Sequence, residues 1–111
     1  MSRRDPELLL EDVSLSIEKI ERYINSFTMD SFKVDDKTVD AVVRNLEIIG
    51  EAVRQIPSAF KEEHSNVPWN QIAGLRNRIV HDYFGLDIEM IWHIVTFDLP
   101  ELKSKIGKIT P

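Results

Sequence analysis

Residues 36–56 read DKTVDAVVRNLEIIGEAVRQI, and their apolar side chains recur at every third or fourth position. This spacing places them along one stripe of an α-helix, as in a helix that packs against a core. The stripe comprises Val39, Val42 or Val43, Leu46, Ile49, Val53 and Ile56. Ile48 and Ala52 add a second apolar strip, so this helix is expected to pack on two sides. Pro57 is expected to end it, because proline cannot continue the hydrogen-bonded ladder.

A helix of the same kind is predicted before it, over residues 6–27. Its apolar positions are again three or four residues apart, which is typical of helix bundles. They are Leu10, Val13, Ile17, Ile20, Ile24 and Phe27. Pro6 suits the first helical position, and Asp5 precedes it as the expected N-terminal cap.

Two more helices are predicted in the second half of the chain. Pro68 opens the third, over residues 69–84, and Gly85 is expected to end it. Asp87 is expected to cap the fourth helix. The apolar stripe of that helix is Ile88, Ile91, Val95 and Leu99. Pro100 should kink or break it, and the following ELKSKIGKIT should continue as a last helical piece.

These segments predict an all-α fold, an up-and-down four-helix bundle formed by a single domain over residues 1–111. Residues 27–36 and 58–67 lie between the helices and are expected to form turns with short additional helices. Apolar side chains on two sides of a helix in so small a chain suggest a further partner surface. The simplest partner is a second copy, so a homodimer is expected.

Composition excludes several kinds of chemistry. The chain has 111 residues, a formal net charge of −5 and no cysteine, which rules out disulfides, thiolate metal sites and cysteine nucleophiles. The lack of cysteine also fits the cytoplasm, where we expect the protein to act. Glu7, Glu11 and Asp12 interrupt the N-terminal leucines, so neither a signal peptide nor a membrane span is expected. His64 and His93 lack a second ligand at metal-binding spacing, so we expect no metal and no cofactor.

The segment RNRIVHDYFGLD, residues 76–87, gathers polar groups that can perform chemistry. Arg76 supplies a guanidinium that can clamp a phosphate, and His81 supplies an imidazole that titrates near neutral pH. These groups suit cleavage of RNA by its own 2′-hydroxyl without a metal. In that reaction a base removes the hydroxyl proton, an acid protonates the leaving 5′-oxygen, and a cation stabilises the negative charge at phosphorus.

The spacing of these residues argues against a self-contained site. On a helix, Asn77 and His81 share one face, whereas Arg76 and Tyr83 lie one above the other on the adjacent face. Arg76 is therefore about 140° from His81 around the axis. One histidine also cannot stand on both sides of the phosphorus. The site is expected to be completed by another helix, or by a second copy of this one across a two-fold axis.

Two plainer interpretations have to be weighed, since arginine and histidine on one helix are most often solvated or paired. The chain would then be a non-catalytic helical module that binds a partner protein or a nucleotide, or a purely structural protein. The negative net charge favours the module slightly, because phosphate contacts supply much of the affinity for nucleic acids. Trp69 and Trp92 are expected in the core or a dimer interface, and Glu51 is either an ion-pair partner of Arg76 or a surface charge.

The longer string around the motif resembles the HEPN superfamily, and in particular its HepT-like branch, once known as DUF86. There the motif reads RN-x-x-x-H-x-Y within a helix, as Arg76, Asn77, His81 and Tyr83 do here. The similarity spans nearly the whole chain. It includes RNLEIIGEAVRQIP at 44–57, PWNQIAGLRN at 68–77 and IWHIVTFDLPELK at 91–103.

This resemblance implies a HEPN-like helical domain that dimerises through the motif helices. It also implies a metal-independent ribonuclease, the toxin of a toxin–antitoxin pair, with Arg76 and His81 as catalytic residues supported by Asn77. The antitoxin of such a pair is a separate MntA-like nucleotidyltransferase, which transfers AMP units to the tyrosine after the histidine, here Tyr83. Bulky, negatively charged nucleotides at that position would block RNA by volume and by repulsion. The resemblance also implies that the partner of a non-catalytic module would be such a nucleotidyltransferase.

Overall fold

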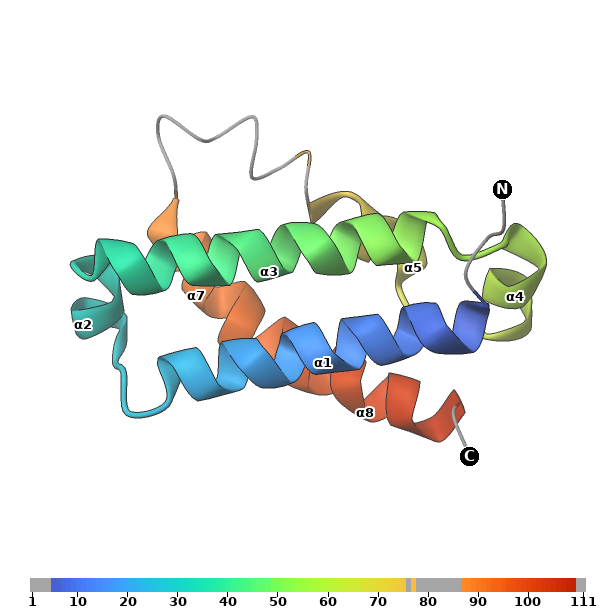
Figure 1. The fold of residues 1–111 in the computed structure, drawn as a ribbon, viewed down its shortest axis with the longest axis horizontal. Helices are drawn as coiled ribbons and strands as arrows, with labels where there is room; N and C mark the ends of the chain where they lie inside the picture. Colours follow the sequence, from blue (N-terminus) through green and yellow to red (C-terminus); the bar gives the residue numbers. More distant parts are fainter. Residues whose placement is uncertain (1–4, 76, 78–86, 110–111) are drawn as a thin grey trace.

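A computed structural model describes residues 5–75, 77 and 87–109. All regular secondary structure in these ranges is helical, which confirms the predicted all-α class. Two long helices, α1 (Pro6–Ile24) and α3 (Asp36–Arg54), run antiparallel and side by side (Figure 1). Among the helices of the described ranges, none is both long enough and apolar enough to cross a membrane.

The first long helix begins where the sequence predicts and ends earlier. Its cap is Asp5, whose carboxylate accepts a hydrogen bond from the backbone N–H of Glu7 at 3.1 Å. The predicted stripe faces the core, with its first four members fully buried and Ile24 and Phe27 partly buried. The helix ends at Ile24 because Ser26 has a φ of 72°, a left-handed conformation that a right-handed helix cannot contain.

The second long helix, α3, contributes more buried hydrophobic side chains to the core than any other described helix. The Asp35 carboxylate accepts a hydrogen bond from the N–H of Thr38 at 3.0 Å, and the helix ends at Arg54, shortly before Pro57. Every position of its predicted stripe is buried. The second apolar strip is covered only in part, since Ala52 is 5% exposed and Ile48 is 37% exposed. Two-sided packing is therefore confirmed at Ala52, whereas Ile48 is partly open to solvent.

Two short helices occupy the connections where short helices were expected. They are α2 (Met29–Lys33) and α4 (Ser58–Glu63). In α2 the Thr28 hydroxyl accepts from the N–H of Ser31 at 3.2 Å, and the Ser31 hydroxyl accepts from the N–H of Thr28 at 2.8 Å. This reciprocal cap fixes α2 so that Phe32 is fully buried, with its ring centroid 5.1 Å from that of Trp92.

The C-terminal segment is one continuous helical path with a wider turn in its middle. It comprises α7 (Ile88–His93), the π-helical η2 (Ile94–Asp98) and α8 (Leu99–Ile109). In η2 the N–H of Leu99 donates to the carbonyl of Ile94, five residues back. We attribute the wide turn to Pro100, which has no N–H for the carbonyl four residues before it and whose ring would collide with that carbonyl. The predicted break at this proline is thus a local π-helical turn.

Three contacts hold the C-terminal path against the long helices. α2 packs on α7, α8 packs on α1, and the Lys103 ammonium donates to the Glu21 carboxylate at 2.9 Å. That hydrogen bond raises the pKa of Lys103. One hydrophobic core runs through the described part of the chain, from Leu9 to Ile106. The four-helix bundle, the single domain and the homodimer stay predictions, since the third predicted helix falls mostly outside the described residues.

Candidate active site

The motif is preceded by a short helix, α5 (Trp69–Ala73), that is firmly attached to the fold. Trp69 is 6% exposed, and its indole Nε1–H donates to the carbonyls of His64 at 2.9 Å and Lys61 at 3.2 Å. The Phe60 ring packs edge-on against the indole at a centroid distance of 6.5 Å. Trp69 is therefore a core residue, as one of its two predicted roles required, and it pins α5 to the end of α4.

A turn at Gly74 interrupts the helix that was predicted over residues 69–84. The N–H of Gly74 donates to the carbonyl of Asn70 at 3.0 Å, and helical geometry resumes at Leu75. The prediction of one unbroken helix is wrong at this point, because glycine is a poor helix former and its missing side chain adds no packing to hold the helix together.

Beyond this turn, the structure places one of the predicted site residues. Leu75 is 5% exposed and anchors the chain in the core, while Asn77 is helical and exposed to solvent. Its carboxamide is accessible from solvent, and its supporting role stays a prediction. The other predicted site residues, Arg76, His81 and Tyr83, lie outside the described residues.

After the motif, the chain returns to a capped helix. The Asp87 carboxylate accepts from the N–H of Met90 at 3.0 Å and so fixes the start of α7, as the sequence predicts. The RNxxxHxY motif thus lies in the sequence between Leu75, which is buried in the core, and Asp87, which caps α7.

Glu51, weighed as a partner for the motif arginine, lies on the outer face of α3. It lines a shallow surface depression together with Arg44, Glu47 and Ile48. Within the described ranges it forms no ion pair, so its carboxylate is a surface charge there. An ion pair between Glu51 and Arg76 stays a prediction.

The two remaining histidines pack on aromatic rings. His64 lies 4.7 Å from Phe60 and His93 lies 4.8 Å from Phe97, measured between ring centroids. In the part of the chain that the structure describes, no three histidine, aspartate or glutamate side chains are grouped to hold a metal ion.

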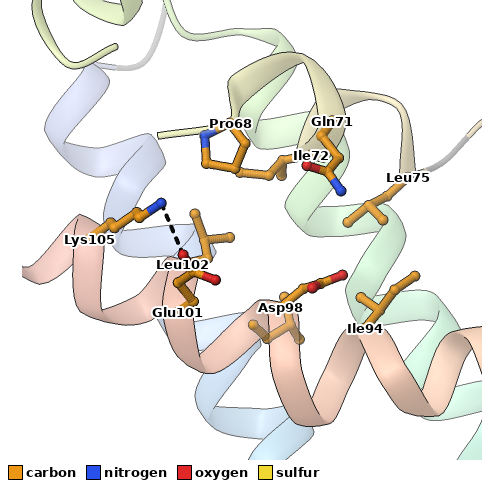
Figure 2. A pocket seen from close by; sticks show the side chains of 10 residues that line it. Pro68, Gln71, Ile72, Leu75, Ile94, Asp98, Glu101, Leu102 and Lys105 are labelled. Carbon is orange, nitrogen blue, oxygen red and sulfur yellow. Dashed lines mark ion pairs between the residues drawn. The ribbon is translucent and has the colours of Figure 1, made fainter. Parts of the chain in front are cut away.

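Sequence reasoning missed a pocket of about 250 Å³ between α5 and the η2–α8 path (Figure 2). Its lining includes Leu75, the residue before the motif, and the polar side chains of Gln71 and Asp98. The one available signal is the acidic Asp98 between apolar residues of the helical path. Its placement opposite α5 depends on tertiary packing, which periodicity does not reveal.

Comparison with known proteins identifies relatives over nearly the full length. A family model described as "Ribonuclease HepT-like" matches residues 13–109. A protein of Thermococcus cleftensis named "Probable ribonuclease HepT" is 41% identical over 96% of this chain and 97% of its own length. A Caldanaerobacter subterraneus subsp. tengcongensis protein named as a "Putative RNase" is 37% identical over 96% of this chain and 95% of its own length.

A third relative joins such a segment to another activity. It is a Methanocaldococcus jannaschii protein named "Gamma-glutamylcyclotransferase and putative RNase", 39% identical over 96% of this chain and 48% of its own length. No solved structure gives a significant match. The family model covers the whole RNxxxHxY motif together with the helices that bound it. The chain therefore belongs to the HepT-like ribonuclease family.

Proposed function

We propose that this protein is a metal-independent endoribonuclease and the toxin of a HEPN–nucleotidyltransferase toxin–antitoxin pair. The observation that carries the proposal is a complete RNxxxHxY motif, with Arg76, Asn77, His81 and Tyr83 in place, inside a segment that matches a ribonuclease family. The exposure of Asn77 next to the buried Leu75 supports a solvent-accessible site at this point of the fold.

The proposed chemistry divides the reaction between two kinds of side chain. Arg76 binds the scissile phosphate and stabilises the charge that develops at phosphorus. His81 transfers protons, as base toward the 2′-hydroxyl or as acid toward the leaving 5′-oxygen. A second copy of the chain supplies the other imidazole, so the working enzyme is a homodimer with a composite site.

Regulation is proposed to act on Tyr83. A cognate nucleotidyltransferase of the MntA type would attach AMP to its hydroxyl, two residues after His81. Each added nucleotide brings a phosphate whose negative charge repels RNA and whose bulk blocks the site.

The first test is cleavage in the absence of free metal. Incubation of the purified protein with RNA and excess EDTA is expected to give fragments with 2′,3′-cyclic phosphate and 5′-hydroxyl ends, because the attacking group belongs to the RNA. End-group analysis by mass spectrometry of the fragments checks this. Fragments with 5′-phosphate ends, or cleavage that requires added metal, would contradict the mechanism.

The second test concerns Tyr83 and uses the chain's other tyrosine as its control. Co-expression with the cognate nucleotidyltransferase is expected to add whole AMP units to wild-type protein and to the Tyr23→Phe variant. The Tyr83→Phe variant is expected to stay unmodified and to remain an active nuclease. Intact-protein mass spectrometry measures the additions. Since Tyr23 is 37% exposed on α1, modification there instead would show that exposure alone selects the tyrosine.

A second candidate function is a non-catalytic module that binds the nucleotidyltransferase or a nucleotide. The formal charge of −5 favours it, because an acidic surface repels RNA. The two candidates differ in the first test, since only the nuclease releases RNA fragments.

A further inference from the structure

The pocket between α5 and the η2–α8 path has an apolar interior. Its walls are formed by side chains that are almost completely buried in the core. They are Ile72, Leu75, Ile94, Leu99 and Leu102. A pocket of about 250 Å³ with such walls suits a flat ring system, which gains affinity by leaving water without needing polar partners on its faces.

The polar groups at the pocket are few, and only some of them are paired with one another. At one end the Lys105 ammonium is paired with the Glu101 carboxylate at 3.2 Å, so these two charges compensate each other. Asp98 is only partly exposed and has no hydrogen-bond or ion-pair partner among the described residues. Figure 2 shows the Gln71 amide and the Asp98 carboxylate facing each other across the opening between α5 and η2. Among the described residues, Asp98 is therefore the charged acceptor of this pocket that no other side chain neutralises.

This combination selects among ring systems. A carboxylate has two oxygens that accept hydrogen bonds and none that donates. Guanine presents two neighbouring donors, N1–H and the N2 amino group, which a carboxylate can accept in a bidentate manner. Adenine and cytosine place an acceptor nitrogen beside their amino group, and uracil flanks its single donor with two acceptors. The Gln71 amide can in addition donate to guanine O6.

We propose that this pocket binds a guanine base, with Asp98 accepting from N1–H and N2–H and Gln71 donating to O6. Because Asp98 leaves the pocket with a net negative charge, the phosphate of a nucleotide would be repelled from it. The base is therefore the part of the nucleotide that we expect in the pocket.

The pocket also lies next to the start of the RNxxxHxY motif in the sequence. Leu75 lines the pocket and is followed in the sequence by Arg76. A guanine within RNA and the base of a free guanine nucleotide would both fit this chemistry. As an RNA subsite the pocket rests on the proposed ribonuclease function, whereas guanine binding itself does not.

The test measures binding of single nucleotides, which contain no bond to cleave. Isothermal titration calorimetry is expected to show that the wild-type protein binds GMP more tightly than it binds AMP. The Asp98→Asn variant should weaken GMP binding by about tenfold or more, since it loses a bidentate acceptor and presents an amide in its place. The matched control is Asp40→Asn, which makes the same exchange at an exposed carboxylate on α3, outside the pocket lining, and should leave GMP binding unchanged.

Several outcomes would overturn the inference. They are equal affinity for GMP and AMP, unchanged GMP binding in Asp98→Asn, and an equal loss in Asp40→Asn. Mapping of cleavage sites then identifies the source of the base. A guanine preference that disappears in Asp98→Asn assigns the pocket to RNA, and GMP binding without any cleavage preference assigns it to a free nucleotide. RNA cleavage without GMP selectivity refutes the pocket alone, whereas GMP selectivity without RNA cleavage refutes only the proposed ribonuclease.

Discussion

Replacement of His81 by alanine is expected to lower the rate of metal-free RNA cleavage by about a hundredfold or more, because general acid–base catalysis typically contributes factors of that size. The loss should appear in kcat rather than in the affinity for RNA, since the proposed role of the imidazole is to move protons and that of the Arg76 guanidinium is to hold the phosphate. Single-turnover cleavage and equilibrium RNA binding, measured on the same variant, separate the two effects.

The chain supplies its own matched control in His93. This histidine is exposed on α7, where its ring stacks on Phe97, and His93→Ala removes an imidazole without touching the motif. Its cleavage rate is expected to equal that of the wild type. Equal activity of His81→Ala and wild type would refute the catalytic assignment, and equal losses in both variants would point to a general effect of losing a histidine.

A mixing experiment examines whether the site is shared between two copies. The His81→Ala variant is mixed in excess with the wild type after dissociation, so that most wild-type copies form heterodimers with a single intact His81. Because the proposed site needs one imidazole from each copy, the cleavage rate per wild-type copy should fall. If that rate stays unchanged although heterodimers form, each chain carries a complete site.

The sequence predicts the starts of α1, α3 and α7 and the buried stripes of α1 and α3 well, because these features have local signals. Apolar side chains three or four residues apart define the buried stripes of α1 and α3, and carboxylates immediately before the first turns act as caps at Asp5, Asp35 and Asp87. These features depend on residues within one or two turns. Nearby residues alone are enough to specify them.

Features that depend on distant residues were harder to predict. The helix-breaking effect of Gly74 is local, but the positions on either side of it are held by distant contacts, since Trp69 attaches α5 to the end of α4 and Leu75 is buried in the core. Pro100 gave the place of a disturbance but not its form, which is a π-helical turn inside a continuous path. The facing of Gln71 and Asp98 arises only when α5 and η2 pack together. For the motif, the sequence supplied the residues and the family, and these remain the basis of the proposed chemistry.

Trp69→Ala is expected to cost about 3–5 kcal/mol of unfolding free energy, the usual range for removing a buried tryptophan or phenylalanine. Two effects add up at this position. The indole fills core space at 6% exposure, and its N–H satisfies the carbonyls of Lys61 and His64. The melting temperature should fall by roughly 10–20 °C, read from circular dichroism at 222 nm.

Two further variants separate these effects and test the role of α5. Trp69→Phe keeps a ring but no donor, so it should lose about 1–3 kcal/mol, because the two carbonyls lose their shared hydrogen bond. Phe97→Ala removes an aromatic ring that is 66% exposed and should change stability by less than about 0.5 kcal/mol. If Trp69→Ala is as stable as Phe97→Ala, the indole does not anchor α5. In that case the chain before Leu75 is held by other contacts, and the motif does not depend on this attachment for its place in the fold.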